Sequence, residues 1–130
     1  MSEKEHNIEQ VKKGFEAFTA GDVEKIMSLI DDSIEWVQPG DSAISGTYHG
    51  KGEFGELLSR MAAKSTTVTP HHFLADGDTV VVLSETTADN ETSEAAQVFT
   101  LRNGKIVRVQ GYADTALMER VYGKKHVATG

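Results

Sequence analysis

Apolar residues near the start of the chain recur at steps of three and four positions, as expected of one helix face. They are Ile8, Val11, Phe15 and Phe18. The stretch Ala-Gly-Asp then ends this helix, with Gly21 as its C-terminal cap and Asp22 as the N-cap of the next helix. A second apolar stripe over residues 23–30 predicts a helix of about two turns.

A strand and a third helix follow. The stretch SIEWV, which begins at Ser33, is typical of a strand. Residues 38–50 contain Pro39 and several glycines, so we expect a loop that rims the fold. Beyond it, Phe54, Leu58 and Met61 lie on the apolar face of the third helix.

From residue 65 onward, β-branched runs alternate with turn residues and predict a meander of four strands. The dipeptides Asp76-Gly77 and Asn103-Gly104 indicate tight hairpin turns, because such turns need positive φ at both central residues. Thr115–Tyr122 forms a short terminal helix that Gly123 ends.

The resulting order, ααβαββββα, predicts an α+β fold in one domain that spans residues 1–130. We expect a strongly curved antiparallel sheet that wraps around the N-terminal and middle helices as a cone-shaped α+β barrel. A sheet bent in this way leaves an internal cavity suited to a small apolar ligand.

The charge balance narrows the choice of partners. Lys and Arg number 13 against 20 Asp and Glu, a net charge of −7 that repels nucleic acid and anionic membranes. No apolar run reaches the length of a membrane span, and the N-terminus does not resemble a signal peptide, so we expect a cytoplasmic protein. The chain has no Cys, and its His spacing gives no metal-binding pattern. We therefore expect neither a metal nor a cofactor.

Asp114 is the first candidate for acid/base chemistry, because it stands where the last strand gives way to the terminal helix. Without a bulge, Gln110, Tyr112 and Asp114 share one face of that strand, while Val107 and Val109 take the other. A buried Asp114 would have a raised pKa suited to proton transfer. The alternative is an N-cap, in which its carboxylate accepts backbone N–H groups.

Other candidates would line the expected cavity. Gln97 is an amide among apolar neighbours on a central strand, and Glu85 is the second acid. Trp36 is the only Trp, and Tyr48 and Tyr112 are aromatic residues with a polar tip. The apolar wall is expected to include Phe15, Phe18, Met61 and Phe99. For each of these residues, a purely structural role is the alternative.

Three stretches resemble the nuclear-transport-factor-2-like superfamily, in particular its SnoaL-like and ketosteroid-isomerase-like members. They are AFTAGDVEKIMSLIDDSIEWVQPG from Ala17, GTYHGKGEFGELLSRM from Gly46 and VFTLRNGKIVRVQGYADTALM from Val98. Folds of this kind host several activities, so the resemblance implies the fold more firmly than a reaction. It also implies a homodimer that closes through the outer sheet face, where Val68, Val80, Val82 and Val107 are expected to lie.

The resemblance narrows the chemistry. Ketosteroid isomerases use a Tyr and two Asp, but the corresponding positions are Gly14, Val37 and Gln97. Limonene epoxide hydrolases carry an aromatic residue and an Asp two positions apart on the last strand, and Tyr112 and Asp114 resemble that pair. They also carry an Arg on a middle strand, which is missing here. SnoaL-like cyclases use a late-strand Asp, which matches Asp114.

Three functions remain. The first is cofactor-free cyclisation or isomerisation of a hydrophobic or aromatic metabolite with Asp114 as acid/base. The second is binding of such a metabolite without catalysis. The third is a dimeric interaction module, with an activity like that of epoxide hydrolases as a minor alternative.

Overall fold

The first two helices end where the sequence predicts. In the computed structural model, which describes residues 2–125, α1 spans Glu3–Ala20 and α2 spans Val23–Leu29. Gly21 has φ of 70°, and its N–H donates to the carbonyl groups that end α1. The Asp22 carboxylate accepts the Lys25 N–H at 3.1 Å and caps α2. Because the two caps are adjacent, α2 follows α1 without a loop.

Six strands form one sheet in the order β2-β1-β6-β5-β4-β3. Their bounds are β1 Ile30–Gln38, β2 Gly46–His49, β3 Thr67–Asp76, β4 Thr79–Ala88, β5 Glu91–Arg102 and β6 Lys105–Tyr112. Helix α3 (Gly50–Ala63) lies between β2 and β3, and α4 (Thr115–Tyr122) follows β6. Strands β1 and β6 run parallel, and all other neighbours are antiparallel.

The predicted α+β fold and its element order are confirmed, and the structure adds two features. The sheet is mixed and does not close into a barrel, since β2 and β3 are its edges. The segment predicted as a loop contains the short strand β2, which pairs with β1 from Gln38 to Glu35. The two strands are joined by residues 39–45, which contain no Asn-Gly or Asp-Gly hairpin signal, so the sequence did not reveal the pairing.

One of the two predicted hairpin turns follows the expected chemistry, and the other is shifted by one residue. Asn103 and Gly104 both have positive φ between the paired residues Arg102 and Lys105. The β3–β4 turn lies one residue later than expected, because Asp76 still pairs with Thr79. Positive φ at Gly77 is retained in this shifted turn.

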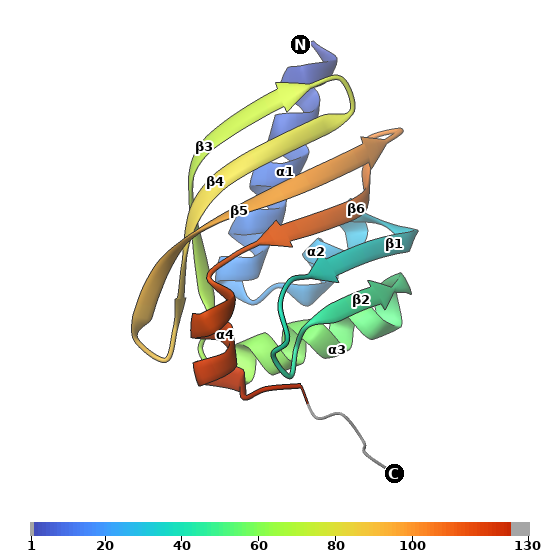
Figure 1. Ribbon diagram of the computed structural model, residues 1–130. Coiled ribbons are helices and arrows are strands. Elements are labelled where there is room, and N and C mark those ends of the chain that lie inside the picture. Colours follow the sequence, from blue (N-terminus) through green and yellow to red (C-terminus); the bar gives the residue numbers. More distant parts are fainter. Residues whose placement is uncertain (1, 126–130) are drawn as a thin grey trace.

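Helices α1, α2 and α3 lie behind the sheet in Figure 1, and α4 lies at its lower end. The sheet face toward the helices carries the core. We expected Val68, Val80 and Val82 on the outer face of the sheet, and this prediction was wrong. Val80 and Val82 are fully buried, and Val68 packs against the core. The opposite face instead exposes Leu74 and Leu83. Among residues 2–125, no helix combines the length and the apolar character that crossing a membrane requires.

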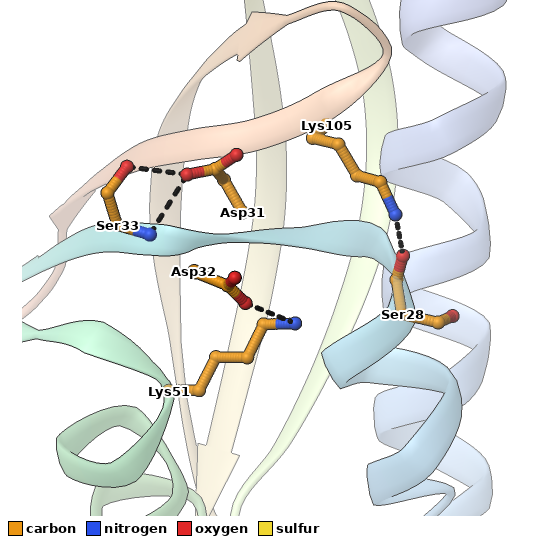
Figure 2. A network of polar contacts seen from close by, with 6 residues as sticks. All are labelled: Ser28, Asp31, Asp32, Ser33, Lys51 and Lys105. Atoms are coloured by element: carbon orange, nitrogen blue, oxygen red, sulfur yellow. Dashed lines mark hydrogen bonds and ion pairs between the residues drawn. The ribbon is translucent and has the colours of Figure 1, made fainter.

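Polar contacts fix the start of β1 at the surface, as Figure 2 shows. The Asp31 carboxylate accepts both the backbone N–H and the hydroxyl of Ser33, and these bonds lower the pKa of Asp31. The Lys105 ammonium donates to the Ser28 carbonyl at 2.6 Å and ties α2 to β6. None of these residues borders the internal cavity, so this network is a structural junction.

Candidate functional site

An apolar cavity of about 110 Å³ lies between the sheet and all four helices. Its wall comes from α1 (Val11, Gly14, Phe15, Phe18), α2 (Ile26, Leu29), α3 (Phe54, Leu58, Met61), α4 (Met118, Tyr122) and the inner sheet face, including Phe99 and Val109. Phe15 packs edge-on against both Phe73 and Phe99, at centroid distances of 6.1 and 5.7 Å. The predicted wall residues Phe15, Phe18, Met61 and Phe99 therefore all border one space.

The strands place Gln97 on the floor of this cavity. Gln97 is only 9% exposed, and its Oε1 accepts a hydrogen bond from the Ser84 hydroxyl at 3.0 Å. Its Nε2 has no hydrogen-bond partner among the described residues, and it is not enclosed by protein atoms. Gln97 therefore offers the cavity an unused N–H donor.

Trp36 forms part of the opposite wall. Its ring stacks on Phe54 at a centroid distance of 5.0 Å, and its Nε1–H donates to the Oε1 of Gln38 at 2.9 Å. Gln38, which the sequence analysis assigned only to the start of a loop, borders the cavity as well. The period of two along β1 brings Trp36 and Gln38 to the same face, a signal that was available in the sequence.

A third polar group comes from α4. The Tyr122 hydroxyl and the Thr66 hydroxyl are hydrogen-bonded to each other, and both residues border the cavity. Burial raises the pKa of Tyr122 above its usual value of 10.0, so the phenol is neutral at neutral pH. Sequence reasoning missed Tyr122 and Thr66, although Tyr122 follows Met118 by four positions and so shares its helix face.

Asp114 lies outside the cavity. Its side chain caps α4 by accepting the Leu117 N–H at 3.0 Å, and the residue is exposed. It borders an open depression on the surface together with Ser93 and Tyr112. The expectation that this carboxylate lies in the cavity is thus wrong. Asp114 instead takes the alternative place, as the N-cap of the terminal helix.

A bulge determines which face of β6 looks inward. Thr100 pairs with Arg108, but the next residue, Leu101, pairs with Ile106, so β6 carries one extra residue at this point. As a result, both Ile106 and Val109 border the cavity, and the alternation that follows turns Gln110 outward. Beyond β6, Asp114 therefore becomes the N-cap of α4 and does not enter the core.

Three other predicted site residues occupy different places. Glu85 is exposed on the outer sheet face, 3.6 Å from the His71 imidazole, because it alternates with the buried Ser84 and Thr86. The Tyr48 hydroxyl donates to the Ile44 carbonyl at 2.6 Å, and Tyr48 does not border the cavity. Tyr112 lies at the cavity edge and is 56% exposed.

Replacing Asp114 with alanine should destabilise the protein by about 1 kcal/mol, because an N-cap carboxylate is lost. Affinity for any cavity ligand should stay unchanged. Chemical denaturation and ligand titration of the variant measure the two effects. Asp114→Asn, which keeps the cap, is the matched control. Loss of ligand affinity in a variant whose stability is unchanged would show that Asp114 belongs to the binding site.

Comparison with protein families gives a match to the SnoaL-like domain over residues 11–109, more than half of the chain. The chain belongs to the SnoaL-like family. The matched region of this SnoaL-like protein includes Trp36, Gln38 and Gln97, but it ends before Asp114. No curated protein matches the chain.

Solved structures agree with this assignment. A protein of unknown function from Burkholderia pseudomallei, described as NTF2-like, is 26% identical, with a TM-score of 0.81 over 94% of this chain and 98% of its own. TerC, crystallised with polyporic acid, is 25% identical, with a TM-score of 0.80 over 90% and 98%. A putative polyketide cyclase from Sinorhizobium meliloti shares the fold at 17% identity and a TM-score of 0.71, over 79% and 93%.

Proposed function

We propose that this SnoaL-like protein binds a small hydrophobic or aromatic metabolite in its internal cavity without taking part in acid/base catalysis. The observation that carries the proposal is the cavity lining. It is overwhelmingly apolar, and within the described residues it contains no Asp, Glu, His, Lys or Arg. Trp36, Gln97, Phe15, Phe18, Met61 and Phe99 are the site residues under this proposal.

The size of the cavity limits the ligand. An engineered apolar cavity of about 150 Å³ accepts benzene, so a cavity of about 110 Å³ suits a molecule built on a single ring. A buried ligand oxygen needs a hydrogen-bond partner. The amide and hydroxyl groups on the wall supply such partners, which favours a ring with one or two oxygens.

Catalysis with Asp114 as general acid or base is the weaker alternative. A proton-transferring group must come within hydrogen-bond reach of its substrate, whereas the Asp114 carboxylate faces solvent and is engaged as a helix cap. Burial raises the pKa of Tyr122, which does border the cavity, so its phenol offers a hydrogen bond and not a base at neutral pH. The place of Asp114 therefore supports binding over turnover.

Titration with acetophenone, followed by NMR of the ¹⁵N,¹³C-labelled protein, tests the proposal. We expect saturable shift changes at methyl groups that border the cavity, such as Val109 and Ile44, and none at the exposed Leu74. Unsaturable changes, or changes centred on the outer sheet face, would contradict an internal site.

A homodimer through the outer sheet face is a second proposal, favoured by the apolar side chains on that face. Leu74, Leu83 and Tyr112 are 54%, 43% and 56% exposed, and cross-strand pairing brings Leu83 beside Ala96 and Ala96 beside Tyr112. Covering these side chains would gain hydrophobic free energy. Light scattering should give twice the monomer mass at micromolar concentration, and a monomer there would contradict the proposal.

A further inference from the structure

Two glutamines stand on the same cross-strand row of the inner sheet face. Gly111 pairs with Gln97 on β5, and Gln110 pairs with Val37 on β1, which places Gln38 beside Gly111 on its other side. The row thus reads Gln38, Gly111, Gln97 from β1 to β5, and all three residues border the cavity. Neighbouring strands are about 4.8 Å apart, so the two glutamine backbones are separated by about 10 Å.

The residue between them leaves this gap open. Gly111 has no side chain, and the Pro39 ring covers it, since a Cβ on Gly111 would lie 3.3 Å from the Pro39 Cδ. Pro39 also borders the cavity. The space between the two carboxamides therefore has an apolar floor.

The oxygen of each carboxamide accepts a hydrogen bond from a neighbouring side chain. The Trp36 Nε1–H donates to Gln38 Oε1 at 2.9 Å, and the Ser84 hydroxyl donates to Gln97 Oε1 at 3.0 Å. Indole nitrogen can only donate, so it fixes the oxygen of Gln38 on its own side. Both amides therefore have their oxygen engaged, and their NH₂ groups have no partner among the described residues.

The unused NH₂ groups beside the cavity are free to donate to a ligand, because neither is enclosed by protein atoms. A ligand that displaces water from them must itself accept their hydrogen bonds, and acceptor oxygens are the groups that satisfy an N–H donor. Among residues 2–125, the lining has no cationic side chain that would compete for such an oxygen. The site thus favours ligands whose oxygens accept hydrogen bonds.

We propose that Gln38 and Gln97 form a paired-carboxamide site that recognises a ring compound with carbonyl-type oxygens on opposite sides, such as a cyclic 1,4-diketone or a quinone. One amide NH₂ donates to each oxygen, while Trp36 and Phe99 flank the ring. This inference rests on the proposed binding function and adds the chemical class of the ligand. Trp36 acts as a positioning residue, because its indole N–H can only donate and so sets the orientation of the Gln38 amide. The Ser84 hydroxyl contacts the Gln97 amide and holds it in place.

The test uses three probes of similar size that differ in acceptor oxygens: cyclohexane-1,4-dione, cyclohexanone and methylenecyclohexane. Gln38→Met and Gln97→Met keep side-chain length and remove the donor. Each should weaken the affinity for the dione about three- to tenfold, which is the effect of one neutral hydrogen bond. Affinity for methylenecyclohexane should not fall. In the wild type, the dione alone should shift the side-chain NH₂ resonances of both Gln38 and Gln97.

Gln110→Met is the matched control, because Gln110 lies on the outward side of the same region of β6. It should bind all three probes like the wild type. If the dione and methylenecyclohexane bind and both cavity variants behave like Gln110→Met, the paired-carboxamide site is wrong while the cavity-binding function stands. If none of the three probes binds the wild type, the binding function itself fails.

Discussion

Replacing Gly14 with leucine is expected to abolish ligand binding and to leave the protein folded. Gly14 borders the cavity from α1, and a Cβ built on it meets no atom within 4 Å. A leucine side chain would therefore extend into the space that the ligand needs. Because glycine inside a helix costs about 1 kcal/mol relative to good helix formers, the variant should be at least as stable as the wild type.

Gly52→Leu is the matched control for this prediction. Gly52 lies within α3, is exposed, and also has open space around its Cβ position. Both variants should gain similar helix stability, but only Gly14→Leu should lose acetophenone binding in the NMR titration. Wild-type affinity in Gly14→Leu, with the variant folded, would show that the probe binds elsewhere.

Replacing Gly40 with alanine should destabilise the protein by about 2–5 kcal/mol, the largest loss we expect from a single added methyl group. Gly40 has φ of 87°, and a Cβ there would lie 2.8 Å from both Cβ and Cγ2 of Thr115. Positive φ costs a residue with a Cβ about 1–2 kcal/mol, and overpacking adds about 1–3 kcal/mol. The clash would separate the loop after β1 from the first turn of α4.

Gly21→Ala separates the two contributions. Gly21 has φ of 70° but no atom within 4 Å of its Cβ position, so only the backbone strain applies. Chemical denaturation should show a loss of about 1–2 kcal/mol for Gly21→Ala and a clearly larger one for Gly40→Ala. Equal losses of stability in the two variants would mean that Thr115 moves away from the added methyl group at no energetic cost. The loop around Gly40 would then be loosely packed against α4.

The loop that contains Gly40 illustrates what a local pattern does not reveal. Its composition predicts a rim, yet Ser42 is fully buried and Ile44 borders the cavity. The Ser45 hydroxyl donates to the Pro39 carbonyl at 2.7 Å, and the Ala43 N–H donates to the Gly123 carbonyl at 2.8 Å. The second of these bonds joins residues that are 80 positions apart in the sequence, so no local window contains both partners.

Local chemistry in the sequence determined the elements of this protein. Helical spacing gave the inward faces of α1 and α3, Gly21 and Asp22 gave the boundary between α1 and α2, and Asn103-Gly104 gave the β5–β6 turn. These signals depend on residues a few positions apart, which is why they can be recognised without coordinates. The apolar wall of the cavity follows from the same periodicities.

Tertiary structure decided how the polar groups on the cavity wall are placed relative to one another. A single bulge opposite Thr100 and Leu101 set the inward face of β6, and the parallel pairing of β1 with β6 brought Gln38 level with Gln97 across Gly111. Register between distant strands follows from the packing of the whole sheet. The sequence therefore specifies a hollow apolar fold, whereas the exclusion of Asp114 from that hollow and the pairing of two carboxamides depend on how the strands align.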